Sequence, residues 1–252
     1  MSAVERGLAR LRVSPEVAAR HPGYAALVLY VHDLRNGPSD AQGAAALRRA
    51  AEQARARLGE GPASADPHIA AWREAYASFG AKPSRYPCSA EALLKRVLRG
   101  DEPPQVNRAV DAYNAISIAF ALPAGGEDLA RLDGAGVLQV ADGSEPYVAF
   151  HDGAETIEHP EPGEIVWADG QGVTCRRWSW RQCRRTQLAE DSTEAYFLLE
   201  RLPPLPLERL LEAGDALAAA LHAFSPGCEV APERIGPGWG NRTDPPPARE
   251  RS

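Results

Sequence analysis

The chain has 252 residues, 44% of them hydrophobic and 25% charged, which is typical of a globular protein long enough to bury a core without metal or disulfide support. A formal net charge of −6 excludes a uniformly basic surface, so any contact with nucleic acid requires a local basic patch. The charged N-terminus and the lack of any stretch near ~18 apolar residues argue against a secretory signal and a membrane span, so we expect a cytoplasmic protein with no membrane contact.

The first half of the chain predicts one strand followed by four helices. Residues 24–34 (YAALVLYVHDL) are apolar and rich in β-branched and aromatic side chains, which indicates a strand. Ser39 and Gln42 form a capping box, which predicts a helix over residues 40–58. Three further helices are expected from Asp66 to Gly80, from Ser89 to Gly100 and from about Val106 to Ala121.

The second half predicts a sheet. Between residues 134 and 202, short β-prone segments such as YVAFH and EIVWA alternate with Gly, Asp and Pro turns, and an apolar stripe then predicts a helix over residues 207–224. We therefore expect a mixed α/β (α+β) fold: an N-terminal strand and helices, then a mostly antiparallel sheet and a C-terminal helix. The expected division is an N-terminal extension (1–20), one folded domain (21–225) and a Pro-rich disordered tail (226–252).

Three polar residues share one face of the fourth helix. Asn107, Asp111 and Asn114 are spaced i, i+4 and i+7, and most residues around them are apolar. Because a helix that is apolar on most sides is buried, these groups need buried hydrogen-bond partners, a cavity or an exposed edge. Three interpretations stay open: Asn107 is only the N-cap and the others face water or a loop, the stripe lines a ligand site, or it contacts a partner subunit.

The segment LPAGGED follows that helix. Pro123 ends the helix, and the adjacent Gly125 and Gly126 permit unusual backbone angles, so they form either an ordinary turn or a pair of amides that face an anion or a carbonyl oxygen. Glu127 comes next, and it either caps a short helix or orients a water molecule.

A basic and aromatic segment, CRRWSWRQCRRTQLAEDST, spans residues 175–193. Arginines interleaved with Trp178 and Trp180 are suited to phosphate contact and base stacking, whereas the alternative is an edge strand with core tryptophans and arginines paired to carboxylates. Thr186 and Thr193 add hydroxyl groups to the same cavity or belong to an ordinary connection. The arginines considered for RNA contact are Arg176, Arg177, Arg181 and Arg185, together with Arg85 from an earlier connector.

Several common catalytic motifs do not occur in the sequence. It contains no P-loop, no GxGxxG after a strand and no GxSxG elbow, and its four cysteines and six histidines show no zinc-ligand spacing. We therefore expect no metal, no cofactor, and no covalent mechanism through serine or cysteine.

The segment from Asn107 to Gly134 resembles the B3/B4 tRNA-editing domain of the phenylalanyl-tRNA synthetase beta subunit, and the flanks WREAYASFGAKPSRY and RRWSWRQCRRT are more similar to freestanding B3/B4-domain proteins. The resemblance covers roughly residues 24–202. Its motif positions here are Asn107, Val110, Asp111, Asn114, Pro123, Asp128, Leu129, Leu132 and Gly134.

The resemblance implies a mixed α/β fold with a pocket between helix and sheet. It also implies hydrolysis of a mischarged aminoacyl-tRNA by a positioned water, with the acceptor end of tRNA as partner and the amino-acid moiety as ligand. Gly125 stands where the synthetase usually has a histidine, and bulky residues from Arg176 to Trp180 replace a glycine-rich segment. Tyrosine specificity is therefore not carried over.

On this basis, Asn107, Asp111 and Asn114 are expected to bind the substrate, with Gly125 and Gly126 as amide donors. Glu127 or Thr193 would orient the water, Trp180 and Thr186 would line the pocket, and the arginines would contact tRNA. The alternatives are a non-catalytic module that binds an amino acid, a small metabolite or RNA in the same pocket, and a purely structural or interaction protein.

Overall fold

The computed structural model describes residues 11–151 and 153–240. The helices are α2 (Pro15–Arg20), α3 (Ala41–Leu58), α4 (Pro67–Ser78), α5 (Ser89–Leu98), α6 (Arg108–Phe120) and α7 (Leu207–Phe224). The strands are β1 (Leu11–Val13), β2 (Ala25–His32), β3 (Ala124–Asp128), β4 (Gly136–Val140), β5 (Tyr147–His151), β6 (Ala154–Glu158), β7 (Ile165–Asp169), β8 (Gly172–Arg176), β9 (Arg181–Gln182), β10 (Ala195–Arg201) and β11 (Glu229–Ile235).

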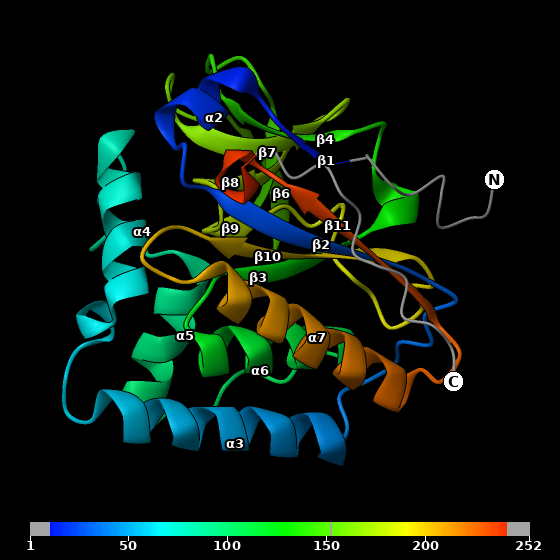
Figure 1. The fold of residues 1–252 in the computed structure, drawn as a ribbon. Helices are drawn as coiled ribbons and strands as arrows, with labels where there is room; N and C mark the ends of the chain where they lie inside the picture. Colours follow the sequence, from blue (N-terminus) through cyan, green and yellow to red (C-terminus); the bar gives the residue numbers. More distant parts are fainter. Residues whose placement is uncertain (1–10, 152, 241–252) are drawn as a thin grey trace.

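The elements form two larger sheets over a layer of helices, and β5 and β6 form a separate two-stranded sheet (Figure 1). The upper sheet has the order β1-β4-β7-β8-β9, and the lower sheet has the order β11-β2-β10-β3. Within these two sheets only β1 and β4 pair in parallel. Below the lower sheet lie α6 and α7, with α3 beneath them (Figure 1). The predicted mixed α+β fold with a mostly antiparallel sheet is confirmed.

Strand β2 is buried along its whole length, which explains why its sequence is a continuous apolar run. It lies between β11 and β10, and its side chains alternate between two hydrophobic cores. Val28 and Tyr30 pack into the core shared with α3, α4 and α5, whereas Leu27 and Leu29 pack into the core shared with α6 and α7.

Local capping signals account for most helix starts. Asp66 caps α4 by accepting from the backbone amides of His68 and Ile69, and Asn107 caps α6 by accepting from Val110. The cap of α3 is Asp40 and not the expected Ser39, whose hydroxyl hydrogen-bonds the carboxylate of Asp111 on α6 instead.

The ends of the chain differ from the sequence-based expectation. Residues 11–20, expected as an extension, form β1 and α2, and the amide of Leu11 donates to the hydroxyl of Tyr30 over 3.1 Å. The expectation of disorder from residue 226 is wrong for residues 229–235, which form β11 along β2. Trp239 then buries its ring against the sheet and donates from Nε1 to the carbonyl of Ala26 over 3.0 Å. Residues 241–252 of the expected tail lie outside the described residues.

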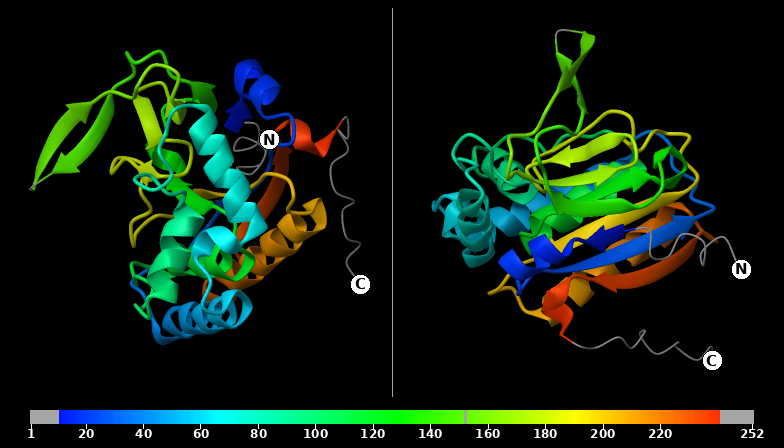
Figure 2. Two further views of the ribbon diagram at one scale, coloured as in Figure 1. Left: turned by 90° about the vertical axis from the view of Figure 1, so that its left-hand side faces the viewer. Right: turned by 90° about the horizontal axis from the view of Figure 1, so that it is seen from above.

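A two-stranded hairpin, β5–β6, projects from the body of the molecule (Figure 2). Its base is fixed by Tyr147, whose buried hydroxyl lies 3.4 Å and 3.3 Å from the carbonyls of Arg181 and Gln182. The hairpin therefore contacts β9 through the side chain of Tyr147.

The packing of the C-terminal segment gives a first prediction. Trp239→Ala should lower the free energy of unfolding by about 3–5 kcal/mol, because it removes a buried ring and its hydrogen bond to the Ala26 carbonyl. Val106→Ala is the control, because that side chain is 52% exposed and its loss should change stability by less than about 0.5 kcal/mol. Equal urea midpoints for both variants would contradict the packing of Trp239 on the sheet.

Candidate functional site

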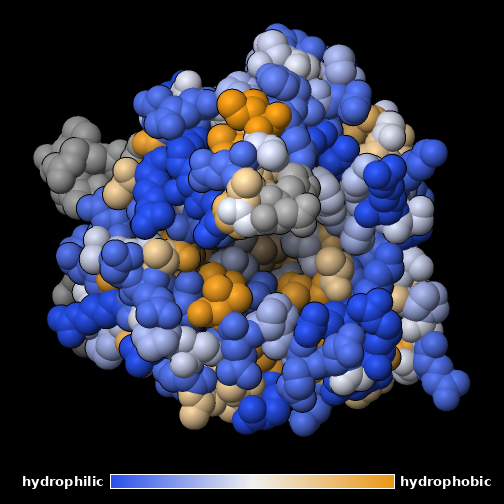
Figure 3. Space-filling model, turned by 180° about the vertical axis from the view of Figure 1, so that it is seen from behind, coloured by the Kyte–Doolittle hydropathy of each residue, from blue (hydrophilic) through white to orange (hydrophobic). Residues whose placement is uncertain are grey.

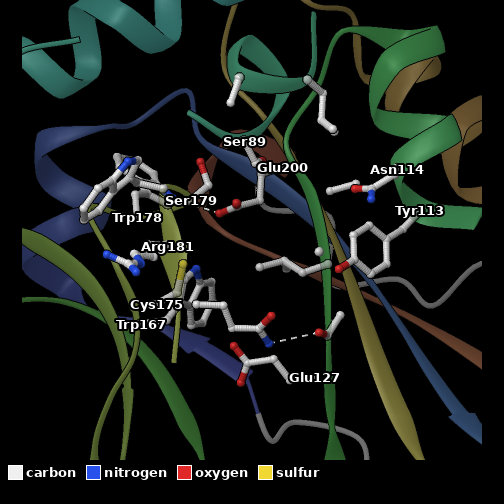
Figure 4. Close-up of a pocket in the computed structure, with 18 of the residues that line it drawn as sticks. Ser89, Tyr113, Asn114, Glu127, Trp167, Cys175, Trp178, Ser179, Arg181 and Glu200 are labelled. Carbon is white, nitrogen blue, oxygen red and sulfur yellow. Dashed lines mark hydrogen bonds between the residues drawn. The ribbon is translucent and has the colours of Figure 1, made fainter. Parts of the chain in front are cut away.

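A cavity of about 300 Å³ lies where α5 and α6 meet the two sheets (Figure 4). Seen from behind, the molecular surface is hollowed near its centre, with hydrophobic side chains around the hollow (Figure 3). The residues that line the cavity are Ser89, Ala92, Leu93, Tyr113, Asn114, Ala124, Gly125, Gly126, Glu127, Trp167, Cys175, Trp178, Ser179, Trp180, Arg181, Gln182, Tyr196, Leu198 and Glu200.

The floor of the cavity is one face of the lower sheet. Alternate residues of β10 point to it, namely Tyr196, Leu198 and Glu200, because successive side chains of a strand point to opposite faces. On β3 the same face carries Gly125, opposite Leu198, and Glu127, opposite Tyr196. The strand register therefore brings two carboxyl groups, Glu127 and Glu200, to one floor.

Glu127 is a buried carboxyl, 5% exposed, with one oxygen that has no partner among the described residues. Burial raises the pKa of Glu127 to about 7, although hydrogen bonds with Tyr196, Thr186 and Thr174 lower it. A carboxyl with a pKa near neutrality and a free oxygen beside a cavity is suited to accept a proton from a bound water.

Glu200 has a different environment. Its Oε1 accepts from the hydroxyl of Tyr24 and from Nε1 of Trp178, each over 2.8 Å, and burial raises its pKa to about 7. Figure 4 shows the two carboxyls apart, with Glu127 at the lower edge of the cavity and Glu200 above it, near Ser179. Glu200 is thus part of a buried hydrogen-bond network through Oε1, and Glu127 has a buried Oε2 without a partner among the described residues.

An unusual turn at residues 176–178 builds the outer wall. Arg177 and Trp178 are consecutive non-glycine residues in the left-handed region, with φ of 48° and 64°. The amide of Arg177 donates to Glu164 over 3.0 Å, and the amide of Trp178 donates to the carbonyl of Ile165 over 2.7 Å. These bonds turn the Trp178 ring inward, where it is fully buried against Tyr24.

Aromatic and guanidinium groups stack on the rim. The guanidinium of Arg177 lies 3.7 Å from the ring centre of Tyr86 and 4.7 Å from that of Trp180. Arg85 lies over Tyr86 at 5.1 Å, and Arg181 lies over Trp180 at 5.9 Å. The predicted interleaving of arginine and tryptophan is therefore real at Trp180, whereas Trp178 belongs to the core.

Gly125 and Gly126 lie in β3 and not in a free turn, which corrects the expectation of two exposed amides. Hydrogen-bonded pairs alternate along an antiparallel ladder, and the amide of Glu200 bonds to the carbonyl of Pro123. The amide of Gly125 therefore points toward β10, and that of Gly126 points to the other edge of β3. The carbonyl of Gly126 accepts from Nε2 of Gln182 over 3.1 Å (Figure 4).

Residues 71–209 match the family model of the B3/4 domain, which is more than half of the chain. The chain belongs to the B3/4 domain family. Among solved structures, the chain is similar to an N-terminal fragment of the phenylalanyl-tRNA synthetase beta-subunit from Pyrococcus horikoshii, with 10% sequence identity and a TM-score of 0.44. The alignment covers 87% of this chain and 49% of that one, so the chain spans about half the length of that fragment. The comparison with curated proteins gave no match.

Within this B3/4 domain, the cavity brings together six of the fourteen residues predicted for a site. Those that line it are Asn114, Gly125, Gly126, Glu127, Trp180 and Arg181. Asn114 is the residue of the helical stripe that faces the ligand space, and its carboxamide makes no hydrogen bond within the described chain. Thr186 is buried and does not line the cavity, but it lies close enough to Glu127 to lower the pKa of that carboxyl.

Three other predicted residues lie outside the cavity. Asn107 is the N-cap of α6, and its amide also donates to the carbonyl of Leu188. Asp111 is fully buried and accepts from Ser39 and from the amide of Val106. Thr193 is exposed in a connection. Asn107 and Asp111 therefore stabilise the fold around the helix. Of the three interpretations left open by the sequence spacing, this is the one in which Asn107 is the N-cap and Asp111 bonds a neighbouring segment.

The predicted basic patch divides into paired and unpaired arginines. Arg176 is buried and bonded to Glu164 and Glu158, and Arg185 pairs with Asp169. Arg177 is buried as well, 3.6 Å from Glu164. In contrast, Arg85, Arg181 and Arg184 are exposed, and none of the described carboxylates forms an ion pair with them.

The sequence-based interpretation missed several lining residues, above all Glu200, Trp167 and Ser89. Glu200 lies near the end of an apolar strand and belongs to no sequence motif. Only its position two residues after Leu198 indicates that both side chains point to the same face of the sheet. Helix α5 begins at Ser89, as expected, and Cys88 takes its N-cap position. The Ser89 hydroxyl, without a partner among the described atoms, lines the cavity.

The cavity also contains the thiol of Cys175. Burial raises the pKa of this thiol well above its ordinary value, so it stays protonated at neutral pH and is a poor nucleophile. No group of three or more metal-ligating side chains occurs in residues 11–151 and 153–240. In the same ranges no helix is long and apolar enough to cross a bilayer.

The two raised carboxyl pKa values predict how stability depends on pH. Glu127 and Glu200 bind protons more tightly in the folded chain, so the free energy of unfolding should fall as pH rises from about 4.5 to about 7, by at most ~1.4 kcal/mol per pH unit for each group. His68, with a pKa lowered to about 4, contributes in the opposite direction.

The measurement therefore compares the free energy of unfolding of wild type with that of a variant that lacks both carboxyls. The double variant Glu127→Gln/Glu200→Gln keeps the acceptors and His68, so the stability difference between wild type and variant isolates the two carboxyls. Urea titrations at pH 5, 6 and 7 should show wild type losing stability relative to the variant. A difference that does not change with pH would contradict the raised pKa values.

Proposed function

We propose that this B3/4 domain protein is an aminoacyl-tRNA deacylase that acts in trans, hydrolysing the ester of a mischarged tRNA with a positioned water. The observation that carries the proposal is Glu127: a buried carboxyl on a cavity floor, with a pKa of about 7 and an unpartnered oxygen. A cytoplasmic location belongs to the same proposal, because charged tRNA is the substrate.

The chemistry uses Glu127 as a general base. Its carboxylate takes a proton from water as the water oxygen attacks the ester carbon, and a tetrahedral intermediate forms. The bond to the ribose oxygen then breaks, and that oxygen takes the proton back from Glu127, which leaves a free amino acid and a free tRNA hydroxyl. A pKa near 7 leaves much of the carboxyl ionised at neutral pH, while it is a stronger base than an ordinary glutamate.

Other residues of the cavity supply binding. The free carboxamide of Asn114 and the unpartnered hydroxyl of Ser89 offer hydrogen bonds to the aminoacyl group. Trp167, Trp178 and Leu198 supply apolar walls. Thr186 is a positioning residue, because it lies beside Glu127 outside the cavity lining and lowers the pKa of that carboxyl.

The exposed arginines support contact with the tRNA acceptor end. Arg181 lines the cavity and lies over Trp180, and Arg184, two residues after β9, lies 4.1 Å from the ring centre of Phe150 on the hairpin. Because these guanidinium groups have no carboxylate partner among the described residues, they are available for phosphates.

The assay for the proposal is ester release from a panel of correctly and incorrectly charged tRNAs, measured against a control without enzyme. Glu127→Gln should lower kcat/KM on the preferred substrate by about 10²–10⁴-fold, because it keeps the shape of the side chain and removes the base. Wild-type rates should rise with pH through about 7 after the uncatalysed rate is subtracted.

Thr193→Ala is the matched control, because this exposed hydroxyl lies outside the cavity and its loss should leave the rate unchanged. Full activity in Glu127→Gln would remove the general base from the mechanism. A wild type that releases no amino acid from any member of the panel would overturn the deacylase proposal.

The RNA contact is tested separately through its salt dependence. Arg181→Gln/Arg184→Gln should weaken tRNA binding and reduce the slope of log Kd against log salt by roughly 1 for each arginine that contacts a phosphate. The control is Arg48→Gln/Arg49→Gln, two exposed arginines on α3, which contributes no residue to this cavity. Equal slopes for both double variants would exclude Arg181 and Arg184 from the RNA contact.

A non-catalytic binding module is the second candidate. It is favoured by Glu200, which is already held by Tyr24 and Trp178, and by the pairing of Arg176 and Arg185 within the fold. In that case the tRNA panel stays flat, and free amino acids or small metabolites raise the melting temperature of the protein.

A further inference from the structure

Gly125 and Gly126 are neighbours in β3, but the structure gives them different reasons to lack a side chain. A Cβ at Gly126 would lie 2.8 Å from Cδ1 of Phe197 and 3.1 Å from Cδ1 of Leu188, so packing requires glycine there. A Cβ at Gly125 would meet none of the described atoms within 4 Å, and its φ lies outside the left-handed region. Neither packing nor backbone conformation therefore requires a glycine at position 125.

The space above Gly125 belongs to the cavity. Gly125 points to the same face of the sheet as Glu127, two residues along the strand, and lies directly opposite Leu198. Tyr196 and Glu200 occupy the neighbouring floor positions on β10. The floor therefore has one position of bare backbone among larger side chains, and that position adjoins the carboxyl with the unpartnered oxygen.

We propose that the reacting ester group of the ligand lies over Gly125, against bare backbone, and that Gly125 is a specificity-determining position. This inference rests on the proposed function and deepens it. A water between Glu127 and the ester carbon must be within hydrogen-bond reach of the carboxylate, about 2.6–3.2 Å. Side chains at i and i+2 of a strand stand about 6.6–6.8 Å apart, so a group bound over Gly125 is within reach of Glu127 through one water.

The test compares three variants of the full chain. Gly125→Ala and Gly125→Val should keep the wild-type melting temperature or raise it, because the space is open and the unfolded chain loses freedom. Their kcat/KM on the preferred aminoacyl-tRNA should fall at least 10-fold and at least 100-fold, respectively. Gly126→Ala is the packing control, and its melting temperature should fall by at least about 2 °C.

A direct binding measurement separates this inference from the proposed function. The probes are amide-linked aminoacyl-adenosines, which resemble the end of charged tRNA but cannot be hydrolysed at the ester position. Their binding is followed by the fluorescence of Trp167, Trp178 and Trp180, which line the cavity. Saturable binding to wild type that weakens at least 10-fold in Gly125→Val would support the inference.

The outcomes are distinguishable. If wild type hydrolyses no charged tRNA but binds a probe that Gly125→Val excludes, the proposed activity is wrong and the position of the ligand over Gly125 stands. If Gly125→Val binds and turns over like wild type, the inference is wrong even when the protein is a deacylase. If wild type neither hydrolyses a charged tRNA nor binds any probe, both are overturned.

Discussion

The outer wall of the cavity depends on the hydrogen bonds that the carboxylate of Glu164 accepts from Arg176 and from the amide of Arg177. Glu164 is 3% exposed, and its two oxygens accept from Nε and from a terminal nitrogen of Arg176 over 3.1 Å and 2.9 Å. The same carboxylate accepts from the amide of Arg177. Two successive left-handed residues would otherwise cost roughly 1–2 kcal/mol each, so this bidentate, charge-assisted pairing is what makes the turn stable.

The turn at residues 176–178 also determines the surroundings of Glu200. The turn buries the Trp178 ring, and Nε1 of that ring, together with the hydroxyl of Tyr24, donates to Oε1 of Glu200. Glu127, at the other end of the floor, is supported from the side of Thr186 and Tyr196 and keeps one oxygen free. Two glutamates with similar pKa values therefore differ in their environment: Oε1 of Glu200 accepts two hydrogen bonds from buried aromatic side chains, whereas Oε2 of Glu127 is buried without a partner among the described residues.

The sequence was informative wherever a local signal decides the structure. Asp66 followed by Pro67 predicts the start of α4, and the apolar stripe of residues 207–224 coincides with α7. Strand β11 could not be predicted in the same way, because its Pro-containing sequence forms a strand only by pairing with β2, about 200 residues earlier.

The site was predictable in part for the same reason. Spacing on α6 places Asn114 on a polar stripe, but it does not distinguish a residue that faces a cavity from Asp111, which faces Ser39 on a neighbouring segment. Composition likewise identifies an arginine-rich segment without showing that Arg176 is neutralised by Glu164, whereas Arg181 is exposed. Both distinctions depend on partners that are distant in sequence.

The position of β2 between two cores has a consequence for how the chain folds. Because alternate side chains of β2 belong to different cores, neither core can be completed before this strand is in place, and we expect the two cores to unfold in a single cooperative transition. The neighbours of β2 in the sheet, β10 and β11, come from the last quarter of the described chain. Such long-range pairing gives a high contact order and slow folding, and during synthesis the first long strand must wait for its partners until nearly all of the described chain has been made.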